Sequence, residues 1–137
     1  MNEIKIFSPA SIANLSCGYD ILGVCLDKVG DKIIVRKTKK RGVVITKITG
    51  QKLSKDIKLN VAGVSATALL NETEVDCGFE IEIHKGIKPG SGIGSSAASS
   101  AGSVFAINQL IGKPYSNKEL VKFAMEGEKA ASGSLHA

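Results

Sequence analysis

The most informative segment of the sequence is Pro89-Gly90-Ser91-Gly92-Ile93-Gly94-Ser95-Ser96-Ala97-Ala98-Ser99-Ser100. Its three glycines stand at alternate positions, which permits positive φ and lets a bulky anion approach the main chain without meeting a Cβ atom. The residues that follow place Ala97, Ala101, Val104 and Phe105 on one face of a helix. The loop therefore opens into a helix N-terminus, where free N–H groups and the helix dipole favour a phosphate.

Polar groups beside the glycines strengthen this interpretation. The hydroxyls of Ser95 and Ser96 could bond a phosphate oxygen or ligate Mg²⁺. Lys85 and Lys88 precede the loop and are expected to supply positive charge on the approach to it. We therefore predict a site for a phosphorylated ligand at this loop.

Other glycine-rich patterns fit this segment less well. A flexible linker would not run without a break into an amphipathic helix. The Walker pattern fails because no lysine follows the last glycine. The run from Gly92 to Ala97 matches the GxGxxA form of the dinucleotide fingerprint, but that motif needs a strand ending at its first glycine and an acid about 20 residues later. Here several residues separate Ile83 from Gly92, and the next acid, Glu119, starts a predicted helix.

The segments around the loop alternate in ways that predict strands and helices. Strands are predicted around Ile4–Ser8, Ile21–Leu26, Ile33–Val35, Val43–Ile48 and Phe79–Ile83, with Gly30, Gly42 and Gly50 as breaks. A helical pattern runs from Asn60 to Leu70. Ser116 and Glu119 have the spacing of a capping box at the start of a last helix.

Positive charge is concentrated between Lys28 and Lys58, where eleven basic residues stand against two acidic ones. The densest part, Arg36–Gly42, lies between two β-branched runs and is predicted to form the tip of a hairpin. Such charges are usually solvated or protect an edge strand. A nucleic-acid surface is the alternative, but the chain has no Trp, two Tyr and four Phe for stacking on bases.

Length and composition exclude several classes of protein. A chain of 137 residues with 43% hydrophobic residues is one domain's length and can fill one core. No run approaches the ~20 apolar residues of a membrane helix, and the first ten residues do not resemble a signal peptide. Cys17, Cys25 and Cys77 lack the spacing of a zinc site or a disulfide framework. We expect a cytoplasmic protein with no membrane partner.

The motifs themselves resemble those of a known family. The run PGSGIGSSAAS is similar to the phosphate-binding motif of the GHMP small-molecule kinases. Within that family, the segment from Ser8 to Gly23, which contains Gly18-Tyr19-Asp20, resembles the first motif of the homoserine kinases. Glu126-Gly127-Glu128 and the segment 131–137 resemble the part that follows in the same kinases.

This resemblance implies an α+β fold in which a mixed sheet packs against helices, similar to ribosomal protein S5 domain 2. It also implies ATP-dependent phosphorylation of the hydroxyl of L-homoserine to O-phospho-L-homoserine, with Mg²⁺. Residues 1–137 would be the ATP-binding N-terminal domain of a longer enzyme, whose C-terminal domain would be a partner and which could form a homodimer. We expect the chain alone to have little kinase activity and to expose an apolar face for the missing half.

The resemblance also assigns roles to residues. The nucleotide would be bound by Pro89, Gly90, Ser91, Gly92, Ile93, Gly94, Ser95, Ser96 and Ala97, with Asn60 near the adenine. One of the two serines, Ser95 or Ser96, would hold Mg²⁺ together with Glu128. Asn14 and Asp20 would face the amino-acid substrate and form its catalytic environment. A carboxylate can pair with an ammonium group, and an amide can orient the polar end of the substrate.

Plainer interpretations of these residues stay open. Asn14 and Asp20 could be turn residues, and Glu126 and Glu128 could lie on a solvated helix face. Two other functions are also compatible with the sequence: a nucleotide-binding module without catalysis, and an RNA-binding domain that uses the basic stretch.

Overall fold

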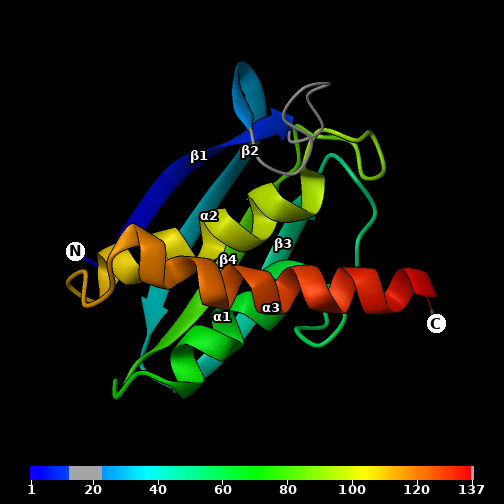
Figure 1. The fold of residues 1–137 in the computed structure, drawn as a ribbon. Helices are drawn as coiled ribbons and strands as arrows, with labels where there is room; N and C mark the ends of the chain where they lie inside the picture. The colour runs from blue at the N-terminus through cyan, green and yellow to red at the C-terminus, as the bar shows by residue number, and fades with distance from the viewer. Residues whose placement is uncertain (13–22, 137) are drawn as a thin grey trace.

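The computed structural model describes residues 1–12 and 23–136, with side chains up to residue 130. Four strands and three helices follow one another along the described chain (Figure 1). Their bounds are β1 (Glu3–Ile12), β2 (Val24–Thr38), β3 (Gly42–Thr49), α1 (Val61–Asn71), β4 (Gly78–His84), α2 (Ser95–Leu110) and α3 (Asn117–His136). The predicted α+β architecture, a mixed sheet packed against helices, is confirmed.

The sheet has the strand order β1-β2-β4-β3. β2 pairs antiparallel with both β1 and β4, whereas β3 runs parallel to β4. The helices lie together on one face of this sheet (Figure 1). Helix α2 packs against β1, β2 and β4, helix α1 packs against β3, and α3 lies across α1 and α2. The glycine loop thus leaves the sheet at the end of β4 and enters the helical layer.

The core lies between the sheet and the helices. Alternate residues of β2 and β4 point into it, as the period of two in their sequences predicts. Ile33, Val35, Phe79, Ile81 and Ile83 are each at most 1% exposed. The predicted helix after Asn60 and the last strand before the loop are therefore confirmed, and the capping box of α3 forms through reciprocal bonds between Ser116 and Glu119.

The prediction of two strands at Ile21–Leu26 and Ile33–Val35 is wrong. From Val24 onward these segments form one strand, β2, which continues through Gly30. A Cβ atom at Gly30 would collide with the backbone of β1, so this glycine permits a close approach of two strands instead of ending one. The pairing of β1 and β2 shifts register between Pro9 and Ser11, close to the same point.

The prediction of a hairpin with its tip at Arg36–Gly42 is also wrong. The chain does reverse there, but β2 and β3 do not pair, because β4 lies between them. Gly78 at the start of β4 fits into the mouth of this turn, where a Cβ atom would collide with backbone oxygens of Lys40 and Gly42. Local alternation could not reveal this long-range insertion.

The helical face predicted for α2 is only partly the buried one. Val104 is buried, but Ala101 and Phe105 are exposed and Ala97 is half-buried. The inner face of α2 consists mainly of small and polar residues such as Ser99, which reach the sheet closely. No helix among the described residues is long and apolar enough to span a membrane.

Candidate phosphate-binding site

The loop between β4 and α2 has the backbone form that its glycines predict. Gly90, Gly92 and Gly94 have φ values of 79°, 81° and 78°, in the left-handed region that favours glycine. A Cβ atom at Gly90 or Gly92 would meet nothing within 4 Å. The main chain of the loop therefore presents an open side on which a bulky group can come close.

Gly94 ends this loop and is the N-cap of α2. It offers no side chain to cap the helix, and the first N–H groups of an α-helix have no partner within the helix. Gly94 also lies close to β1, because a Cβ atom at this position would lie 2.6 Å from Ser11 Oγ. The Ser11 N–H also donates to the carbonyl oxygen of Ile93 at 2.9 Å, which ties the loop to β1. The geometry favours an anion at the start of α2.

The structure separates the two serines that follow the loop. Ser96 Oγ donates to Glu128 Oε2 of α3 at 3.1 Å, whereas Ser95 Oγ donates to the carbonyl oxygen of Ile87 at 3.3 Å. The other oxygen of Glu128, Oε1, is buried and has no hydrogen-bond partner among the described residues. Ser96 and Glu128 are thus brought together, and Ser95 serves the base of the loop.

The Ser96–Glu128 pair fits a magnesium ion chemically. A hydroxyl and a carboxylate are hard oxygen donors, and Glu128 Oε1 is a buried acceptor left free for a ligand. Within the described part of the chain, no cluster of three or more His, Cys, Asp or Glu residues could hold a metal ion by itself. This donor set suits Mg²⁺, which commonly binds through one or two carboxylates and the phosphates of a substrate.

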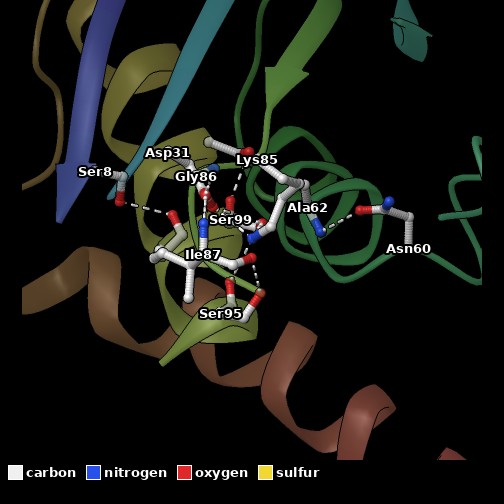
Figure 2. Close-up of polar contacts among 11 residues, drawn as sticks. Ser8, Asp31, Asn60, Ala62, Lys85, Gly86, Ile87, Ser95 and Ser99 are labelled. Carbon is white, nitrogen blue, oxygen red and sulfur yellow. Dashed lines mark hydrogen bonds and ion pairs between the residues drawn. The ribbon is translucent and has the colours of Figure 1, made fainter. Parts of the chain in front are cut away.

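The sequence predicted Lys85 on the approach to the loop, and this prediction is wrong. Lys85 is buried, and its ammonium pairs with the carboxylate of Asp31 on β2 (Figure 2). Lys88 is exposed, as expected for a residue on the approach. Asp31 was not among the predicted site residues, although its position in the sequence is informative: it stands two residues before Ile33, at an inward position of an apolar strand.

The remaining predicted site residues have different surroundings. Asn60 is the N-cap of α1: its Oδ1 accepts from the Ala62 N–H at 2.9 Å, and its Nδ2 donates to the Ser54 carbonyl at 2.9 Å. Pro89 and Ser91 are exposed on the loop, whereas Ile93 and Ala97 are half-buried. Asn14 and Asp20 lie outside the described residues.

Part of the basic stretch between Lys28 and Lys58 makes contacts that stabilise the fold. The guanidinium of Arg41 donates to the carbonyl oxygens of Leu70, Thr73 and Val75, at and after the C-terminal end of α1. Lys39 and Lys40 are exposed at the same turn.

An apolar groove of about 530 Å³ lies between β1, α2 and α3. It runs beside the site, because Glu128 also lines it. Its lining includes the exposed apolar side chains of Phe7, Phe105, Val121 and Met125. The helical face predicted from the sequence for α2 contributes Ala97, Ala101 and Phe105 to this groove.

Comparison with known proteins identifies the family of the chain. Residues 49–136 match the family described as the GHMP kinases N terminal domain. The chain belongs to this family. The match includes the glycine loop, the start of α2 and Glu128, so the site lies within the part that defines the domain.

Two relatives are especially similar to this GHMP kinase domain. A homoserine kinase of Methanococcus maripaludis is 44% identical over 140 residues, which cover 100% of the chain and 46% of the relative. The crystal structure of a homoserine kinase from Cytophaga hutchinsonii is 46% identical and has a TM-score of 0.91, covering 97% of the chain and 43% of that protein. The chain thus spans about half the length of these relatives.

A mevalonate kinase structure shares the fold at 20% identity, with a TM-score of 0.72. At this identity the similarity concerns the fold alone.

Proposed function

We propose that the chain is the ATP-binding N-terminal domain of a protein that phosphorylates the hydroxyl of L-homoserine with ATP, giving O-phospho-L-homoserine. The observation that carries the proposal is the glycine loop at the N-terminus of α2, with positive φ at all three glycines. Similarity to homoserine kinases along the whole chain supports the substrate.

In this proposal the loop binds the phosphates of ATP through its main chain. The open side of Gly90 and Gly92 admits the phosphates, and the N–H groups at the start of α2 donate to their oxygens. Phosphoryl transfer requires mainly positioning and charge stabilisation, so the hydrogen bond that ties the loop to β1, from the Ser11 N–H to the Ile93 carbonyl oxygen, is the relevant property.

Ser96 and Glu128 would hold Mg²⁺ from the side of α2 and α3. When bound, Mg²⁺ neutralises charge on the phosphates. The hydrogen bond from Ser96 to Glu128 supports this assignment, because it brings the two oxygen donors together.

The amino-acid substrate would be bound by Asn14 and Asp20, as the family resemblance implies. The Asp20 carboxylate would pair with the ammonium of homoserine, and the Asn14 amide would orient its polar end. For Asn60 we propose an indirect role at the adenine end, since both polar atoms of its side chain serve the start of α1.

The apolar groove between β1, α2 and α3 would be covered by the remaining half of a protein as long as the relatives. Its exposed apolar side chains and the relatives' length, more than twice that of the chain, support this occupant. A homodimer of the full-length protein stays a prediction.

A coupled assay of ADP release tests the proposed reaction. We expect the full-length protein to turn over with L-homoserine at on the order of 1 per second or more, and the Asp20→Asn variant to lose most of this rate. L-Serine, which is one methylene shorter, serves as the control substrate. A full-length protein that binds MgATP but does not phosphorylate L-homoserine would contradict the proposed substrate.

A further inference from the structure

A buried ion pair lies beside Ile87 and Ser95, which stand on either side of the glycine loop (Figure 2). Lys85 Nζ and Asp31 Oδ2 are 2.5 Å apart, and their side chains are 1% and 0% exposed. Lys85 follows β4 at the entrance of the loop segment, and Asp31 comes from the middle of β2. Neither residue has a role in the proposed reaction so far.

All three hydrogen atoms of the Lys85 ammonium have acceptors within the protein. Besides Asp31, Nζ donates to the carbonyl oxygen of Ser95 and to Ser99 Oγ, each at 3.0 Å. An ammonium group has three donors, so none is left for a phosphate. Lys85 therefore acts on the site through α2, whose first residue it holds.

Asp31 holds the other end of the loop. Its Oδ1 accepts from the N–H groups of Gly86 and Ile87, at 2.8 and 3.1 Å. Ile87 is in turn linked to Ser95, whose hydroxyl donates to the Ile87 carbonyl oxygen. Asp31, Lys85, Ser95 and Ile87 thus form a closed ring of polar contacts that joins the two ends of the loop (Figure 2).

A buried ion pair is poor evidence for a gain in stability, since apolar residues of similar volume often stabilise a protein equally well. The effect of this pair is on geometry, because its contacts fix the distance between Ile87 and Ser95, on either side of the glycines. We propose that Lys85 and Asp31 are positioning residues for the phosphate loop, which set the place of the α2 N-terminus without contacting the nucleotide. The positioning itself rests on the polar contacts, whereas its effect on nucleotide binding rests on the proposed function.

The double variant Lys85→Met/Asp31→Asn separates positioning from folding. A single replacement would leave one buried charge without a partner and could unfold the chain. In the double variant both charges are removed, the asparagine keeps an oxygen for Gly86 and Ile87, and methionine fills the volume of the lysine. The carbonyl oxygen of Ser95 and the hydroxyl oxygen of Ser99 lose their ammonium donor, so the contacts that hold the start of α2 are removed.

The control is Leu69→Ala, which creates a cavity in the core at α1 and leaves the loop contacts in place. Leu69 is fully buried, so this variant lowers global stability without changing the polar ring. Amides near the loop exchange with solvent through local opening, and their rates should not follow a change in global stability.

The measurement is amide hydrogen exchange at Ser11 and Ala98, which bond to the loop carbonyls of Ile93 and Gly94. We expect exchange at both amides to be about tenfold faster in the double variant and unchanged in Leu69→Ala. An increase smaller than roughly threefold in the double variant would overturn the proposal.

A second readout keeps this inference distinct from the proposed function. Titration with MgADP should show about tenfold weaker binding by the folded double variant and unchanged binding by folded Leu69→Ala. If the unaltered chain failed to bind MgADP, the proposed function would be in doubt, but the exchange rates would still decide whether the pair positions the loop.

Discussion

Ser95 and Ser96 are adjacent in the sequence, yet their hydroxyls serve different parts of the molecule. Ser95 bonds the Ile87 carbonyl at the base of the loop, and Ser96 bonds Glu128 on α3. The sequence could predict that a hydroxyl lies at the start of α2. It could not select between the two, because the choice depends on how α3 crosses α2.

This difference predicts unequal effects of two alanine substitutions. Ser96→Ala should reduce by about tenfold the amount by which Mg²⁺ strengthens ADP binding, since the proposed hydroxyl ligand of the metal is lost. Ser95→Ala, the matched control, should keep the effect of Mg²⁺. Titrations with ADP, with and without Mg²⁺, measure both. The reverse pattern would show that Ser95 holds the metal.

Glu82, on the face of the sheet that the helices do not cover, makes the stability of the fold depend on pH. A hydrogen bond from His84, and then one from Arg36, lower the pKa of the Glu82 carboxyl below its ordinary value of 4.5. A lowered folded-state pKa gives stability that is present above the unfolded-state value and is lost as pH falls through the folded-state value.

Glu82→Gln should therefore lose less stability than the original chain between about pH 5 and pH 2. Urea unfolding at several pH values measures how steeply the free energy of unfolding of each protein falls with pH, relative to its value at pH 7. Equal slopes would mean that Glu82 does not contribute to the acid sensitivity.

At the scale of whole elements, the sequence predicted their kinds better than their arrangement. The helix after Asn60, the capping box of α3 and the alternation of β4 are local patterns, and each appears in the structure. The insertion of β4 between β2 and β3 depends on contacts between residues far apart in the chain. The small, polar inner face of α2 also gave no apolar periodicity to follow.

Arg41 connects the turn between β2 and β3 to the end of α1. Its guanidinium bonds carbonyl oxygens at and after the end of α1, where a positive charge also suits the helix dipole. Arg41→Met should lower the free energy of unfolding by about 1–2 kcal/mol. Lys39→Met removes the same charge from the exposed part of the turn and should change stability by less than about 0.5 kcal/mol. Equal effects in chemical unfolding would contradict the role of Arg41 at α1.

At the scale of the whole molecule, the candidate site at the start of α2 and the apolar groove lie side by side, since Glu128 bonds Ser96 and also lines the groove. The family resemblance predicted an exposed apolar face, and the groove between β1, α2 and α3 is such a face. Residue types alone could not place it, because Phe105 and Ala101 suit a core equally well.

Phe105→Glu tests what covers this groove. If the chain is part of the proposed longer protein, we expect the charge to open the proposed contact between its two halves and to speed limited proteolysis between them about tenfold. Val44→Glu, at an exposed apolar residue of β3, is the control and should have no such effect. Unchanged proteolysis of the Phe105→Glu protein would mean that the second half does not cover the groove.

Titration of MgADP into the chain and into its Gly92→Val and Gly112→Val variants tests whether the glycine loop binds the nucleotide. Both glycines have positive φ, at 81° and 91°, and both have open space where a Cβ would stand, so the backbone strain is matched. Gly112 follows the far end of α2. If the loop binds phosphates, Gly92→Val should weaken binding at least about tenfold and Gly112→Val should leave it unchanged. Equal binding by all three proteins would contradict the placement of the nucleotide at the glycine loop.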